Sequence, residues 1–159
     1  MQFNLEGSFR VRELVVKFKS GAGKCQSLSD PASVDKLLRP MLIEEPREKF
    51  VGLYLDTQNH LAALEVISQG TSNCSLVSPR ESFKTAFLVN ASSVIFVHNH
   101  PSGNPTPSKE DIEIAIRLKE AARILDFEML DFVIIAREGY YSFAASQPKF
   151  NPDLISDRR

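Results

Sequence analysis

The chain has 159 residues, of which 43% are hydrophobic and 25% charged, and its formal net charge is −1. These values are typical of one globular domain with a core of its own, and they provide no overall basic field for nucleic acid or anionic lipid. The sequence has no run of about 18 apolar residues, and its start lacks the basic and apolar regions of a signal peptide. Cys25 and Cys74 are too few for a disulfide scaffold. We therefore expect a cytoplasmic protein that does not associate with membranes.

The first predicted elements are a strand at residues 8–18 and a helix that begins after Asp30. Residues 8–18 alternate loosely between apolar and polar side chains. Asp30 would cap the helix and Pro31 would take its first position, where no N–H donor is needed. Pro40 should bend or end this helix, because proline removes an internal hydrogen bond. Its expected buried face consists of Val34, Leu37, Leu38, Met41 and Leu42.

A hairpin and a second helix are predicted next. Residues 49–55 and 60–68 are rich in apolar side chains, and the polar residues 56–59 between them have the composition of a turn. After a loop, Ser78 would cap the second helix, with Glu81 reaching back to complete a capping box. This segment therefore predicts two antiparallel strands followed by a helix.

The second half of the chain predicts a strand at 93–97, a helix at 108–125, a strand at 128–136 and a short strand at 140–143. From Ala144 onward the chain is polar and should form a loosely ordered tail. The order of strands and helices suggests an α/β sandwich, in which helices cover both faces of a mixed sheet. The inner face of the helix at 108–125 should consist of Ile114, Leu118, Ala121, Ala122 and Leu125.

Two histidines directly follow the strand at 93–97. Because strand side chains alternate, His98 and His100 should point to the same side. After a proline-rich loop, Ser108 would cap the next helix, and Asp111 would lie in its first turn. Taken singly, these residues could be packed, hydrogen-bonded histidines and an ordinary helix cap. Together they bring two imidazoles and a carboxylate to one place, which is the usual ligand set of a catalytic zinc site with one open position.

The full spacing is His-x-His-Pro, six further residues, and then Ser-x-x-Asp. It resembles the JAMM signature of the MPN-type zinc metalloproteases at every defined position. The words HNHPSGNPTPS at 98–108 and SPRE at 78–81 resemble the RadC branch of that superfamily. The resemblance implies the MPN/JAB fold, a curved mixed sheet flanked by helices and similar to the cytidine-deaminase sandwich.

The resemblance covers roughly residues 46–144, which we expect to form the RadC-like domain. Residues 1–45 should contribute a strand and a helix that pack on this domain, and residues 145–159 should form the C-terminal tail. Longer RadC proteins carry an N-terminal helix-hairpin-helix module. We expect this chain to lack that module, because its first 45 residues are too short for one and partly strand-like.

The family's chemistry, carried over to this sequence, is hydrolysis by a zinc-activated water. The resemblance implies that Zn²⁺ is bound by His98, His100 and Asp111 and that the substrate is a peptide or an isopeptide-linked protein. It also implies that Ser108 donates a hydrogen bond to the tetrahedral oxyanion.

Glu48 is the expected general base, because the Arg-Glu-x-Phe pattern of RadC-like chains falls on it. From sequence alone, an exposed charge at the end of a strand is the favoured interpretation of Glu48, and only the resemblance favours the catalytic one. The other candidate bases are Glu44, Glu45 and Glu65.

One position departs from the family pattern. RadC-like chains read Asp-His-Leu-Ile where this sequence has Asp131, Phe132, Val133 and Ile134. The missing histidine removes any role that the family would assign to Phe132, but it leaves the three expected ligands in place.

Two other classes of function stay open. The first is a DNA-repair or mobile-element-associated factor that acts on or binds nucleic acid, against which the near-neutral charge and the expected lack of the N-terminal module argue. The second is a non-catalytic, metal-stabilised binding module, against which the complete ligand set argues. A homodimer is one expected form, since MPN domains often pair.

Overall fold

In a computed structural model, which describes residues 27–70 and 77–147, five strands form one mixed sheet in the order β2-β1-β3-β4-β5. β1 pairs antiparallel with β2 and β3, β3 pairs parallel with β4, and β4 pairs antiparallel with β5. The strand β3 is therefore central. The strands are β1 (Glu48–Leu55), β2 (Leu61–Gly70), β3 (Ser93–His100), β4 (Glu128–Ala136) and β5 (Gly139–Ser142).

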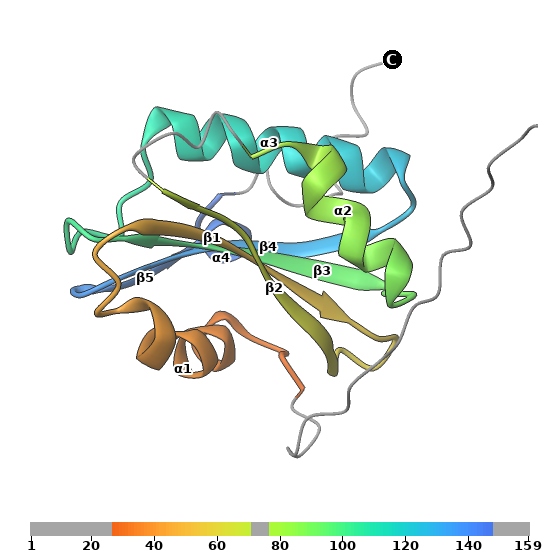
Figure 1. Ribbon diagram of the computed structural model, residues 1–159, viewed down its shortest axis with the longest axis horizontal. Coiled ribbons are helices and arrows are strands. Elements are labelled where there is room, and N and C mark those ends of the chain that lie inside the picture. The colour runs from red at the N-terminus through yellow and green to blue at the C-terminus, as the bar shows by residue number, and fades with distance from the viewer. Residues whose placement is uncertain (1–26, 71–76, 148–159) are drawn as a thin grey trace, which may run out of the picture.

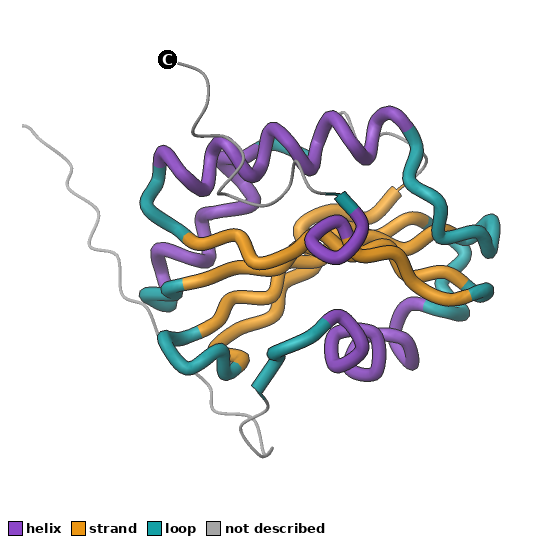
Figure 2. Tube along the Cα trace, turned by 180° about the vertical axis from the view of Figure 1, so that it is seen from behind, coloured by secondary structure: helices purple, strands orange, loops and turns teal. Residues whose placement is uncertain are grey.

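Helices cover both faces of the sheet and give three layers (Figure 1). The helix α1 packs on one face, and α2 and α3 pack on the other; the view from behind shows the same layers (Figure 2). This arrangement is the α/β sandwich of the MPN/JAB fold, as predicted. The helices in the described residues are α1 (Pro31–Leu42), α2 (Pro79–Leu88), α3 (Lys109–Ile124) and α4 (Phe143–Ser146).

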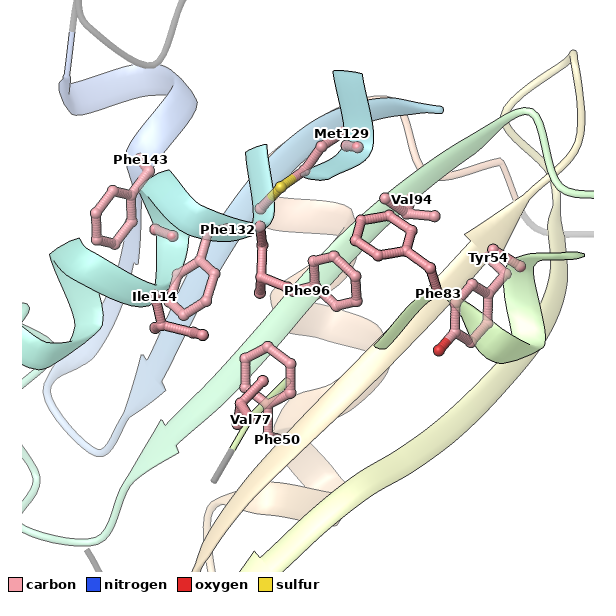
Figure 3. Packing of buried hydrophobic residues seen from close by; sticks show 14 of the residues in the cluster. Phe50, Tyr54, Val77, Phe83, Val94, Phe96, Ile114, Met129, Phe132 and Phe143 are labelled. Carbon is pink, nitrogen blue, oxygen red and sulfur yellow. The ribbon is translucent and has the colours of Figure 1, made fainter. Parts of the chain in front are cut away.

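The layer between the sheet and α2 and α3 is built on aromatic side chains (Figure 3). Phe96 of β3 stacks on Phe50 of β1 at 5.5 Å between ring centroids, and Phe83 of α2 meets it edge-on at the same distance. Phe132 lies 5.8 Å from Phe50 and 5.1 Å from Phe143 of α4. Such ring contacts add stabilisation beyond the burial of their area, so this layer fixes α2 and α4 against the sheet.

The other layer buries the inner face of α1, although Met41, predicted to belong to that face, is exposed. The helix continues through Pro40 to Leu42, although an interior proline costs about 3 kcal/mol. Leu38 and Leu42 are both buried against the sheet, and each fully buried leucine contributes about 1.5–3 kcal/mol. Packing on both sides of the proline therefore outweighs its cost. The expected core residue Met41 is 41% exposed.

The C-terminal boundary also differs from the expectation. Where a tail was predicted from Ala144, α4 follows β5 and buries Phe143. Asp131 of β4 holds this turn, because its carboxylate accepts hydrogen bonds from the Ser142 hydroxyl at 2.5 Å and from the Ala144 N–H at 2.9 Å. The ordered domain thus extends through this helix. The predicted strand at 8–18 and both cysteines lie outside the described residues.

Candidate metal centre

The candidate site lies at the carboxyl end of the central strand. β3 extends past the predicted end to include both histidines, and it stays paired with β4 as far as His100 opposite Ala136. His98 is opposite Phe50 of β1, whose side chain belongs to the layer below α2 and α3. Because alternate residues of a strand share a face, Glu48, His98 and His100 belong to this face of the sheet.

The predicted ligands lie together. One ligand atom from each of His98, His100 and Asp111 is within 4.8 Å of the other two. His100 Nε2 is 3.2 Å from Asp111 Oδ2, and His98 Nδ1 is 3.9 Å from Asp111 Oδ1. His98 and Asp111 are buried and His100 is partly exposed, so the cluster is open to solvent on the side of His100.

The start of α3 orients the carboxylate of Asp111. Ser108 caps the helix as predicted, and the two residues form a reciprocal capping box. The Ser108 hydroxyl and N–H donate to Asp111 Oδ2 at 2.7 and 2.8 Å, and the Asp111 N–H donates to Ser108 Oγ at 3.1 Å. The same capping that begins the helix therefore holds the carboxylate beside the histidines.

The loop before α3 orients the ring of His100. Its Nδ1–H donates to the carbonyl oxygen of Asn104 at 2.9 Å. A carbonyl can only accept, so Nδ1 carries a proton, and Nε2 is the ring atom that faces Asp111. Metal-binding histidines are commonly oriented in this way by a second hydrogen bond.

The charges of the group suit a cation. Burial lowers the pKa of His98 to about 4, so this ring is neutral at pH 7. Burial works to raise the pKa of Asp111, but hydrogen bonds from His100 and Ser108 outweigh it and hold this pKa well below its usual range. Burial likewise opposes a charge on His100, yet its bond to Asp111 leaves the pKa of His100 raised. A neutral imidazole and an ionised carboxylate are the ligand forms that a metal requires.

The four candidate bases occupy different places. Glu48 Oε2 is 3.9 Å from His98 Nε2, and the side chain is partly exposed. Glu45 pairs with Lys49 at 2.6 Å, and Glu65 of β2 accepts hydrogen bonds from Tyr54 of β1 and Thr85 of α2. Glu44 is exposed after α1. Glu48 is thus the candidate whose carboxylate lies beside the three predicted ligands.

Two buried residues of the sheet, Phe132 and Asn99, are not accounted for by the metal-binding motif. Phe132, where the family has histidine, is fully buried among the aromatic rings and is part of the core. Asn99, between the two histidines, is also buried, and sequence reasoning assigned it nothing. Alternation could have flagged it, because it continues the row of Ile95 and Val97, both of which are buried and apolar.

An α/β sandwich with a His-His-Asp group at the end of its central strand is a candidate metal-binding domain of the JAB/MPN kind. A family model described as a RadC-like JAB domain matches residues 28–148. The chain belongs to this family.

Curated relatives agree with this assignment. A UPF0758 protein of Methanosarcina mazei is 45% identical over 117 residues, which make up 74% of this chain and 51% of that protein. UPF0758 proteins of Syntrophomonas wolfei and Thermotoga maritima are 48% and 46% identical, again over 74% of this chain and over 52% and 53% of their own lengths. The chain spans about half the length of the curated relatives it matches.

Within residues 27–70 and 77–147, no helix combines the length and the hydropathy that a membrane-spanning segment needs.

Proposed function

We propose that this chain is a zinc-dependent hydrolase that cleaves peptide or isopeptide bonds. The observation that carries the proposal is the convergence of His98, His100 and Asp111 within 4.8 Å, with the carboxylate of Glu48 beside them. Two imidazoles and one carboxylate are a donor set that suits zinc and leaves a coordination position open. When bound, zinc would act as a Lewis acid and lower the pKa of water.

Glu48 is proposed to transfer protons. Burial raises the pKa of its carboxyl above the ordinary value, which brings it nearer to neutral pH, where a general base works best. Its partial exposure lets a water molecule reach the carboxylate. Glu48 would take a proton from this water and return it to the leaving amine.

Ser108 is proposed to have two functions. In this structure its hydroxyl donates to Asp111 Oδ2, so it orients that ligand. Donation to the oxyanion of a tetrahedral intermediate, the role expected from the family, requires the hydroxyl proton to turn away from Asp111. Such a contact commonly contributes about 3 kcal/mol to catalysis.

The substrate, the oligomeric state and the location are further parts of the proposal. We infer that the substrate is a peptide or an isopeptide-linked protein, that the chain works in the cytoplasm, and that it forms a homodimer. Light scattering and cell fractionation test the last two points directly.

The first experiment is the metal content of protein purified without a histidine tag. Wild type should contain about one zinc per chain, and His98→Ala should contain none. His60→Ala is the matched control, because His60 lies at the hairpin tip beside Asp56 and the substitution should leave the zinc in place. Zinc-loaded wild type is then assayed on peptides and isopeptide-linked conjugates, with Glu48→Gln as the control of strongly reduced activity.

Three outcomes contradict the proposal. A protein that takes up no zinc even after reconstitution is not a zinc enzyme. Stoichiometric zinc without turnover on any peptide or isopeptide substrate favours a metal-stabilised binding module. Salt-dependent binding of duplex or forked DNA, without hydrolysis, favours a nucleic-acid factor.

A further inference from the structure

Asn99 lies on the opposite face of the sheet from the metal ligands. It is opposite Ile135 of β4, which belongs to the layer under α1. His98 and His100, its neighbours in the chain, point to the other face by strand alternation. A substitution at Asn99 therefore leaves the three ligand side chains unchanged.

The side chain of Asn99 binds the backbone on both sides of Glu48. Its Oδ1 accepts a hydrogen bond from the Lys49 N–H at 2.6 Å, and its Nδ2 donates to the Arg47 carbonyl at 3.2 Å. A side-chain amide has the same donor and acceptor as a peptide group. The side chain of Asn99 therefore makes the two hydrogen bonds to β1 that a peptide group of a neighbouring strand would make.

These two bonds lie where the pairing between β1 and β3 ends. The register of the two strands runs from Leu55 opposite Ser93 to Phe50 opposite His98, whereas β3 continues to His100 beside β4. At the start of β1, the amide of Asn99 supplies the bonds that join the backbone around Glu48 to β3. The strand that holds both histidines thus also holds the peptide groups of the proposed base.

We propose that Asn99 is a positioning residue, which fixes the backbone at Glu48 so that its carboxylate stays beside His98. The proposal rests on the proposed function, because Glu48 is the base of that reaction. Asn99 touches neither substrate nor metal in this account and acts through Glu48 alone. The buried amide is satisfied by the two backbone groups it binds, which explains a polar residue in an apolar row.

The test compares wild type with Asn99→Ala, which loses both bonds. Ser93→Ala is the matched control, because Ser93 is a buried polar residue at the other end of β3 and its hydroxyl bonds Asn59. In Asn99→Ala we expect full zinc content, an unchanged KM and a kcat about 100-fold lower, since small misplacements of a catalytic group have effects of this size. The Lys49 amide should exchange its hydrogen about tenfold faster, as expected when one hydrogen bond is lost.

A double variant separates positioning from a general loss of stability. In the Glu48→Gln background, Asn99→Ala should cause no further loss of kcat, because the group through which it acts is already gone. An equal kcat in wild type and Asn99→Ala, or a further loss in the double variant, would overturn the proposal. If Asn99→Ala does not fold, Asn99→Leu keeps the branched shape of the side chain, lacks both hydrogen bonds and gives the same comparison.

If wild type hydrolyses nothing, the proposed function fails, and the positioning is judged without turnover. Hydrogen exchange of Lys49 and crystal structures of both zinc-loaded proteins then decide. Faster exchange and a displaced Glu48 carboxylate in Asn99→Ala support the positioning role. Unchanged exchange, or a carboxylate in the same place, refutes it.

Discussion

Asp111 has a structural role in the helix cap and a proposed role as a metal ligand, and two substitutions distinguish them. The carboxylate belongs to the capping box of α3 and to the candidate metal group. Asp111→Asn keeps an oxygen at the position of Oδ2, which accepts both hydrogen bonds from Ser108. Asp111→Ala removes that acceptor. Both variants lose the negative charge.

The expected magnitudes follow from the hydrogen bonds. The two bonds from Ser108, at 2.7 and 2.8 Å, end on a charged and buried acceptor. At roughly 1.5 kcal/mol each, their loss should destabilise metal-free Asp111→Ala by about 3 kcal/mol. Asp111→Asn should remain within about 1 kcal/mol of wild type, because a neutral acceptor still makes both bonds. Zinc at 100 times the Kd of wild type should then stabilise wild type by about 2.7 kcal/mol. The same zinc concentration should stabilise neither variant.

Urea unfolding near pH 7.5, in EDTA and in excess zinc, measures all of these free energies. If Asp111→Asn gains as much from zinc as wild type does, Asp111 is not a ligand. If Asp111→Ala is as stable as Asp111→Asn in EDTA, the account of the helix cap is wrong. The two results are independent, so each part of the reasoning can fail alone.

Three further predictions concern the base, the core and a buried acid. Glu48→Gln should retain one zinc by metal analysis while hydrolysis falls by about 100-fold or more; undiminished turnover would assign proton transfer to another carboxylate. In Gly52→Ala, the new Cβ would lie 2.5 Å from Tyr54 Oη, so urea unfolding should show a loss of about 1–3 kcal/mol, and wild-type stability would contradict this packing. Burial raises the pKa of Asp131 in the folded protein despite its bond to Ser142. The stability that protonated Asp131 contributes is therefore complete below the pKa of the unfolded chain, and it is lost as pH rises through the pKa of the folded protein. Asp131→Asn stays neutral, and its stability relative to wild type should therefore increase from about pH 3 to about pH 8; a gap that is independent of pH would rule this out.

Local patterns were sufficient to predict much of the fold and the place of the ligands. Strand alternation places His98 and His100 on one face, and the cap at Ser108 places Asp111 in the first turn of α3. Both inferences depend on residues close together in the chain. The nearness of Glu48 to this group depends instead on pairing between distant strands, and only the family pattern singled it out.

Other features depend on contacts that no local pattern contains. Pro40 stays inside a helix because the sheet buries leucines on both sides of it. α4 forms because Asp131, in a different strand, binds the turn that begins it. Glu81 should have completed a capping box in α2, yet its carboxylate pairs with Lys84 at 3.0 Å. Alternation places Asn99 in a buried row of β3, but its partners are backbone groups of a distant segment, which the sequence does not specify.

The antiparallel pairing of β1 with β3 makes the candidate site sensitive to register. The three candidate ligands come from one continuous segment of β3, the loop and α3, whereas Glu48 reaches them through β1. A slip of one residue between the two strands would turn Glu48 to the other face of the sheet and leave the ligands together. Zinc content would then count the molecules in which the segment from β3 to α3 has formed, and turnover would count those in which the whole sheet is correctly paired. The ratio of turnover to zinc content therefore measures the fraction of zinc-containing molecules in which β1 and β3 are correctly paired, and it can be determined for each preparation of the protein.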